Sequence, residues 1–273
     1  MSYKEIFVVL SPEAKAVGPY AASLAKAFGA NTRAAGIAID PTMPSYVIPE
    51  MPSDVLEQAR AASREEAQAR LASYESKAGE IGVSVDGFVV QGMMDRSAAQ
   101  IERMARYYDL TIIEQPGSDR DKGGPIFVEA VLFGSGRPLL IVPYIQRAPM
   151  KLDHVIVAWD ESATAAKAVT AAMPLLKQAG TVEIVGVSTG AEAERERGER
   201  LAKVLAGHGI KTKSRLLTNV GSVSDSILSH AADNGADLIV MGGYGHSRMR
   251  ELILGGATRG ILESMTVPVL MMH

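Results

Sequence analysis

The chain has 273 residues, a formal net charge of −3 and no cysteine, and 47% of its residues are hydrophobic. The lack of cysteine excludes disulfide bonds, thiol catalysis and cysteine-ligated metals, and the balanced charge with only 5% aromatic residues disfavours a nucleic-acid partner. No signal peptide and no run of 18 apolar residues is found, so we expect a cytoplasmic protein that does not bind membranes.

The first half alternates strand-like and helix-like segments. Strands are predicted over 4–10, 33–39, 83–91, 110–113 and 139–142, with helices over 14–28, 53–78 and 97–107. The stretch 42–52 is rich in proline and is predicted to be a loop. Residues 133–136, Phe-Gly-Ser-Gly, are predicted to form a turn.

The same order of elements restarts after a short linker at 147–150. Strands are predicted over 153–160, 181–187, 211–218, 238–241 and 267–271, with helices over 163–178 and 192–207, after Ser222, and over 257–264. Two matching runs predict tandem domains, 1–148 and 151–273, on a length that suits two domains. Alternating strands and helices predict parallel sheets with right-handed crossovers.

Two glycine pairs surround the end of the predicted strand 238–241. Gly242-Gly243-Tyr244-Gly245 follows the strand, and Gly255-Gly256 precedes the helix that starts at Ala257. Free N–H groups in the first turn of that helix would attract an anion such as phosphate. Tight turns without a ligand explain the glycines equally well, and neither a Walker loop nor GxGxxG is present.

The spacing of Gly242, Gly245 and Gly255 resembles the nucleotide motif of the universal stress protein family. The resemblance covers both halves and implies two doubly wound, five-stranded parallel sheets of the adenine nucleotide alpha hydrolase-like α/β class, with strand order 3-2-1-4-5. It also implies ATP, or ADP or AMP, with Mg²⁺ as a further option. ATP-binding members have Ser or Thr where this chain has Gly256, a departure for which Thr258 could compensate.

Ligands of open α/β sheets bind beyond the carboxyl ends of the strands. Together with the resemblance, which assigns Asp160 to the ribose and adenine end, this rule predicts the nucleotide-binding set. Its members are Ala158, Trp159, Asp160, Val187, Met241, Gly242, Gly245, His246, Gly255, Gly256, Ala257 and Thr258.

The first half is predicted to be a degenerate copy without a nucleotide site. Ser11 stands where Asp160 does, and Glu114-Gln115-Pro116-Gly117 is set against Met241-Gly242-Gly243-Tyr244. A carboxylate at Glu114 would repel phosphate, and Pro116 has no N–H to donate.

No catalytic residues stand out, and the five histidines lack the spacing of a metal site. We expect a nucleotide-responsive stress regulator rather than a fast enzyme. A scaffold that binds no nucleotide and acts through protein association, and a slow ATP hydrolase, remain alternatives. The apolar last strands, 139–142 and 269–272, are expected to pair within the chain as a pseudo-dimer, and a homodimer of chains stays open.

Overall fold

The computed structural model describes residues 2–41, 53–117, 125–188, 193–219, 221–244 and 256–273. It contains two compact units. The N-terminal unit comprises Tyr3–Arg137 and Arg147–Pro149, and the C-terminal unit comprises Pro138–Gln146 and Met150–His273 together with Met1–Ser2. The domain limits predicted from the sequence, 1–148 and 151–273, stay a prediction.

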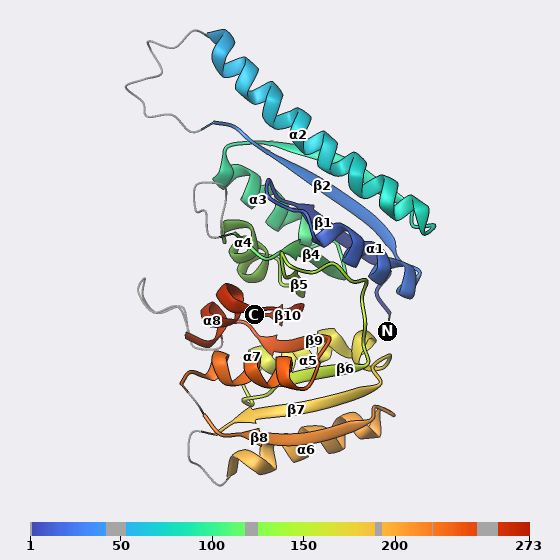
Figure 1. Cartoon of the computed structure of the whole chain (residues 1–273), viewed down its shortest axis with the longest axis vertical. Coiled ribbons are helices and arrows are strands. Elements are labelled where there is room, and N and C mark those ends of the chain that lie inside the picture. The colour runs from blue at the N-terminus through green and yellow to red at the C-terminus, as the bar shows by residue number, and fades with distance from the viewer. Residues whose placement is uncertain (1, 42–52, 118–124, 189–192, 220, 245–255) are drawn as a thin grey trace. The chain divides into compact units, whose positions relative to one another are not determined.

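The N-terminal unit is a parallel sheet wrapped by helices (Figure 1). Its strands lie in the order β3-β2-β1-β4. The apolar runs of β1 and β4 are buried on both faces, as is typical of parallel sheets. The elements are β1 (Glu5–Leu10), α1 (Val17–Phe28), β2 (Asn31–Ile39), α2 (Ser53–Glu80), β3 (Val85–Gly92), α3 (Met94–Ala105), β4 (Leu110–Glu114) and α4 (Ile126–Gly134).

The C-terminal unit repeats this plan in the order β8-β7-β6-β9-β10, with all neighbours parallel. Strand β5 (Leu139–Val142) then pairs antiparallel with β10 (Val269–Met272). The other elements are β6 (His154–Ala158), α5 (Ala163–Leu176), β7 (Thr181–Val187), α6 (Ala193–Gly207), β8 (Thr212–Leu217), α7 (Val223–Asp233), β9 (Leu238–Gly242) and α8 (Gly256–Ser264).

The α/β class and the predicted strand order 3-2-1-4-5 are confirmed. In the C-terminal unit the order β8-β7-β6-β9-β10 is third, second, first, fourth and fifth, and the N-terminal unit follows it over β3-β2-β1-β4. The predicted pairing of the two last strands is present, because Leu270 lies opposite Leu140 in the antiparallel pair β10–β5.

Two local predictions for the N-terminal half need correction. Helix α4 was not predicted, because its sequence IFVEAVLFG is apolar on nearly every side and has no helical period. Helix α1 begins at Val17 rather than at residue 14, because the preceding N–H groups bind the side chain of Glu114. The predicted loop at 42–52 lies outside the described residues.

Candidate nucleotide-binding site

The carboxyl ends of β6, β7 and β9 lie at one edge of the C-terminal sheet. In the parallel register Ala158 is opposite Val185, and Val157 is opposite Val240. Of the residues predicted to contact nucleotide there, Ala158, Trp159 and Val187 are half-buried, Met241 is buried, and Asp160 is exposed. The structure therefore brings together the strand-end residues that the sequence predicted as one group.

The exit of β6 is a tight polar turn in front of α5. Asp160 Oδ1 accepts a hydrogen bond from the Ser162 backbone N–H at 2.9 Å, and Ser162 Oγ caps α5 by accepting from the Ala165 N–H at 3.1 Å. These bonds fix the position of Asp160 while leaving its side chain exposed. An exposed carboxylate held in this way can accept hydrogen bonds from the hydroxyl groups of a sugar.

Glu161, which the sequence did not single out, adopts a left-handed backbone conformation with φ of 62°. Its two carboxylate oxygens contact α6, with Arg197 Nε at 3.1 Å and Arg200 at 3.0 Å. The only other non-glycine residue with positive φ in the described part of the chain is Tyr244, at 50°, beyond the exit of β9. Backbone strain of this kind gathers at functional sites, and here both instances flank the same edge of the sheet.

Gly242 is required by packing rather than by ligand approach. A Cβ atom there would lie 2.5 Å from Thr164 Oγ1 and 2.6 Å from the Ala165 backbone nitrogen. The exit of β9 thus sits directly against the start of α5. The neighbouring loop donors are also engaged: the Gly243 N–H bonds Met272 O at 2.9 Å.

Thr258 fastens the loop after β9 to helix α8. Its side chain is 4% exposed, and its Oγ1 accepts a hydrogen bond from the Tyr244 N–H at 3.1 Å. The hydroxyl group therefore serves the loop, and its predicted contact with phosphate stays a prediction. Gly245, His246 and Gly255, from the predicted set, lie outside the described residues.

The start of α8 is the part of the predicted phosphate site that the structure describes best. Gly256 is exposed, and a Cβ atom there would meet no atom within 4 Å. Ala257 is half-buried beside it. The first N–H groups of a helix have no partner within their own helix, so this end can receive an anion.

Trp159 adds an unpaired donor to this edge. Its indole Nε1 is buried and has no hydrogen-bond partner among the described residues, although a buried indole N–H normally has one. A ligand with an acceptor atom fits this observation. The residue types present, an exposed carboxylate, a helix start and an indole donor, suit a nucleotide.

The matching exit in the N-terminal unit is filled by a side chain. Asp109 accepts the N–H of Glu5 as Asp237 accepts that of His154, so the two units can be aligned residue by residue. When the two units are aligned on these aspartates, Glu114 matches Gly242. The sequence alone had aligned Glu114 with Met241, one position earlier. Glu114 is 5% exposed and fills the exit, and its predicted repulsion of phosphate stays a prediction.

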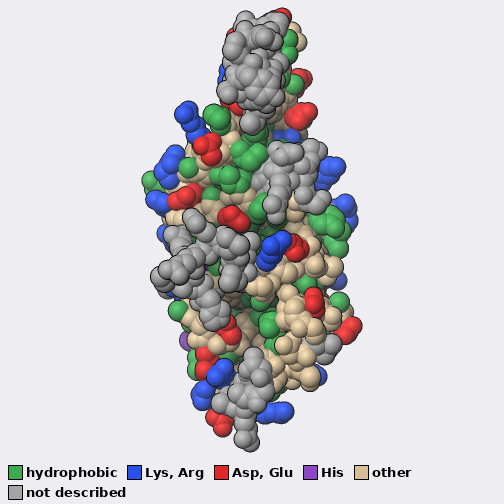
Figure 2. Space-filling model, turned by 90° about the vertical axis from the view of Figure 1, so that its left-hand side faces the viewer, with side chains coloured by type: hydrophobic (Ala, Val, Ile, Leu, Met, Phe, Trp, Pro, Cys, Tyr) green, Lys and Arg blue, Asp and Glu red, His purple; other side chains and the backbone are tan. Residues whose placement is uncertain are grey.

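Surface charge, metal ligands and helix hydropathy were the basis of the predicted absence of other partners. On the face drawn in Figure 2, cationic and anionic side chains are interspersed. Within the described ranges, no three His, Asp or Glu side chains are grouped to hold a metal ion. In the same part of the chain, no helix is long and apolar enough to cross a membrane. The predictions of no nucleic acid, no membrane and a cytoplasmic location stay predictions.

Comparison with known proteins identifies the family of the C-terminal half. The model of the universal stress protein family matches residues 151–273. This half of the chain belongs to the universal stress protein family. Universal stress protein Slr1230 of Synechocystis sp. is 41% identical over 68 residues, which are 25% of this chain and 23% of that protein. Universal stress protein MJ0577 of Methanocaldococcus jannaschii is 32% identical over 79 residues, 29% of this chain and 48% of that protein.

The universal stress protein fold extends over both halves. The crystal structure of a universal stress protein from Archaeoglobus fulgidus has a TM-score of 0.75 and 19% identity, covering 98% of this chain and 95% of that one. The N-terminal unit therefore has the same fold as the C-terminal unit, that of universal stress proteins. The chain spans less than half the length of the two curated relatives that it matches, so activity and partners are matters for proposal.

Proposed function

We propose that the C-terminal universal stress protein domain binds an adenine nucleotide, ATP or else ADP or AMP, at the carboxyl ends of β6, β7 and β9. Asp160 would hold the ribose, and the start of α8 at Gly256 would receive the phosphates, with Mg²⁺ carried on them. The N-terminal unit would bind none. The protein would act as a cytoplasmic, nucleotide-responsive regulator whose hydrolysis of ATP is slow or absent.

One observation carries this proposal. The two non-glycine residues with positive φ in the described chain both lie at strand exits: Glu161 follows the exposed Asp160 at the exit of β6, and Tyr244 lies beyond the exit of the neighbouring strand β9. Strain of this kind costs about 1–3 kcal/mol at each position and gathers at functional sites, so its occurrence at both exits supports a ligand there. The buried, unpaired indole N–H of Trp159 at the same edge supports a ligand as well.

The test is nucleotide binding by the full chain. Denaturing mass spectrometry of the purified protein would detect co-purified nucleotide, and calorimetry with ATP, ADP and AMP would rank affinities. We expect Asp160→Ala to abolish a nucleotide-induced rise in melting temperature, and Ser11→Ala, its matched control in the N-terminal unit, to leave it unchanged. No shift in the parent protein at millimolar ATP would sink the proposal.

A scaffold without nucleotide is the second candidate, because Gly256 stands where ATP-binding relatives have a hydroxyl residue. Loss of a hydrogen bond to a charged group costs about 1.5–3 kcal/mol. Restoring it with Gly256→Ser should therefore tighten ATP binding by at least about tenfold if the site holds phosphate. If neither the parent nor this variant binds ATP, ADP or AMP, the scaffold is the better reading.

A further inference from the structure

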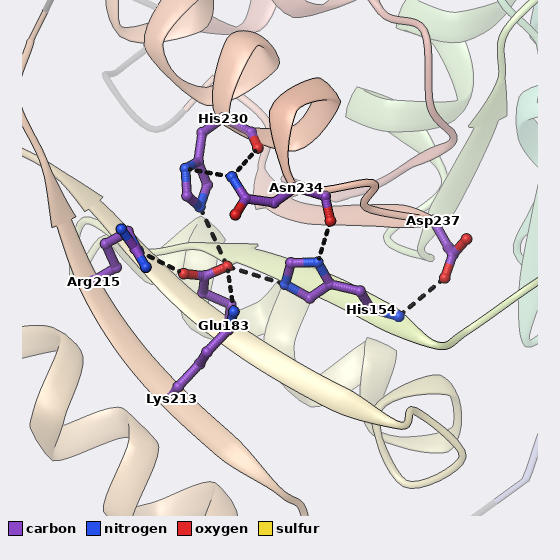
Figure 3. Close-up of polar contacts among 7 residues, drawn as sticks. All are labelled: His154, Glu183, Lys213, Arg215, His230, Asn234 and Asp237. Carbon is purple, nitrogen blue, oxygen red and sulfur yellow. Dashed lines mark hydrogen bonds and ion pairs between the residues drawn. The ribbon is translucent and has the colours of Figure 1, made fainter.

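A second polar cluster lies away from the strand exits, around the buried carboxylate of Glu183 (Figure 3). Glu183 stands inside the otherwise apolar strand β7, and its side chain is 0% exposed. Its Oε2 lies 3.2 Å from Lys213 Nζ, and its Oε1 accepts from Arg215 Nε at 3.0 Å. Both cations come from the neighbouring strand β8. A buried carboxylate needs such partners, because an unpaired charge in the interior is very costly.

His154 of β6 contacts two groups that can only accept hydrogen bonds. Its Nε2 lies 3.0 Å from Glu183 Oε2, and its Nδ1 lies 3.2 Å from the Asn234 carbonyl oxygen. Neutral imidazole carries one N–H, whereas imidazolium carries two. Both contacts are hydrogen bonds only when His154 is protonated.

His230 of α7 shows the opposite pattern. Its Nδ1 lies 3.2 Å from the side-chain nitrogen of Asn234, and that nitrogen also donates to the His230 carbonyl oxygen at 2.8 Å, which fixes the orientation of the amide. His230 Nδ1 therefore accepts, as in neutral imidazole. Its Nε2, which then carries the single proton, lies 3.2 Å from Glu183 Oε2.

The contacts of His154 join three elements of the C-terminal unit. Asn234 ends helix α7, and Asp237, which accepts the His154 backbone N–H at 2.9 Å, leads into β9. Glu183 holds the other end of the imidazole on β7. His154 therefore fastens the α7–β9 junction to the sheet, and β9 runs from that junction to the exit at Gly242.

We propose that His154 is a proton-dependent latch: as imidazolium it bridges Asn234 to Glu183, and loss of the proton opens one of these two bonds and loosens the α7–β9 junction. The latch is independent of nucleotide binding. Other charged or titratable groups face it from every packed element: Asp237 before β9, Lys213 and Arg215 on β8, and His230 on α7.

The pH direction follows from the bonding. The two bonds exist while the proton is bound, so their contribution to stability is present at acidic pH and disappears as the pH rises. Free imidazole loses its proton near pH 6.5, close to cellular pH. The N-terminal unit has no counterpart, because Glu5 and Arg33 occupy the positions matching His154 and Glu183.

Nuclear magnetic resonance of the ¹⁵N-labelled full-length protein tests the latch directly. At pH 7 we expect His154 with both ring nitrogens protonated and His230 with a proton on Nε2 alone. The exposed His208 is the internal reference. If His154 titrates together with His208, the latch is refuted.

Amide hydrogen exchange measures its consequence. After correction for intrinsic exchange, protection of residues 231–238 should fall about tenfold between pH 6 and pH 8.5, the effect of losing one hydrogen bond. His154→Gln should remove this pH dependence, and His208→Gln should retain it. Equal pH dependence in the parent and His154→Gln would overturn the proposal, and if that variant does not fold, the resonances of the parent decide.

Discussion

The exits of β4 and β9 are the same place in two copies of one fold, and they are built in opposite ways. At the β4 exit, Oε2 of Glu114 accepts the backbone N–H groups of Lys15, Ala16 and Val17, which lead into α1. At the β9 exit, Gly242 has no side chain, and the start of α5 packs against the bare strand end.

The contrast shows how one side chain can fill a strand exit without altering the fold. Helix starts attract anions, and the N-terminal unit supplies that anion from its own chain. The C-terminal unit instead caps α5 with the neutral hydroxyl of Ser162, which leaves the nearby carboxylate of Asp160 exposed. The N-terminal copy therefore keeps an intact sheet, and it differs because the carboxylate of Glu114 occupies this strand exit.

Removing the Glu114 carboxylate should have the largest effect on the free energy of unfolding. Glu114→Ala leaves the buried N–H groups of Ala16 and Val17 without an acceptor, at about 1–3 kcal/mol each. We expect the free energy of unfolding to fall by about 3 kcal/mol in urea, followed by circular dichroism. Glu114→Gln retains an acceptor oxygen and should lose about half as much.

The control for this prediction is Glu57→Gln on the exposed surface of α2, which should change the free energy of unfolding by less than about 0.5 kcal/mol. Trp159, the single tryptophan, reports on the C-terminal unit by fluorescence. A loss below about 1 kcal/mol in Glu114→Ala would mean that the carboxylate is not needed to complete the start of α1.

The glycine exit should be damaged by one methyl group. Gly242→Ala places a Cβ atom against Thr164 Oγ1 and the Ala165 backbone, and overpacking of this kind costs about 1–3 kcal/mol. Gly256→Ala is the matched control, because its Cβ atom meets nothing within 4 Å. Urea unfolding followed by Trp159 fluorescence should separate the two variants, and equal stability would contradict the packing role of Gly242.

Glu183 on β7 and Arg33 on β2 occupy matching positions in the two units, and we expect them to respond differently to acid. Burial alone raises the pKa of Glu183, but contacts with His230 and Lys213 outweigh burial and lower it overall. Its folded pKa is depressed, so its contribution to stability is present above about pH 4.3 and is lost as the pH falls below that value. Glu183→Gln should flatten the pH dependence of Trp159-detected unfolding between pH 5 and 3.

Arg33 gives the control for that titration, because it occupies the matching position on β2 and pairs with the exposed Asp86 at 3.1 Å. Exposed ion pairs contribute about 0–1 kcal/mol, so Arg33→Gln should leave the acid response of the protein nearly unchanged. If Glu183→Gln loses stability in parallel with the parent at every pH, the carboxylate charge is not the titrating group.

Periodic sequence features predicted most of the fold, and local side-chain contacts accounted for what they missed. The limits of β7 were predicted without error, because an apolar run lies between clear turn signals. The cap of α7 was also right, since Ser222 Oγ accepts the Asp225 N–H at 3.1 Å. Helix α4 was not predicted, because a helix that is apolar on nearly every side lacks the polar stripe that reveals a helical period in the sequence.

The candidate site was predictable as a location but not as a set of contacts. Strand ends and glycines pointed to one edge of the C-terminal sheet, and the structure brings the predicted strand-end residues together there. The reason for Gly242 lies in α5, some 80 residues earlier in the chain, and no local pattern reveals that packing. The lone Glu183 in the apolar strand TVEIVGV was a visible signal, because a charge in a buried strand requires partners.

The smallest effect on stability is expected for Glu161, the residue with positive φ that follows Asp160. The position matching Glu161 is Pro12, whose ring forbids positive φ. Glu161→Gly would relieve about 1 kcal/mol of strain, and it would also remove contacts with Arg197 and Arg200 that are exposed and contribute little. We expect a gain in stability below about 1 kcal/mol, measured by thermal unfolding. If the strain instead holds Asp160 in position for a ligand, this stabler variant should bind nucleotide more weakly, whereas equal or tighter binding would show that the left-handed turn is incidental.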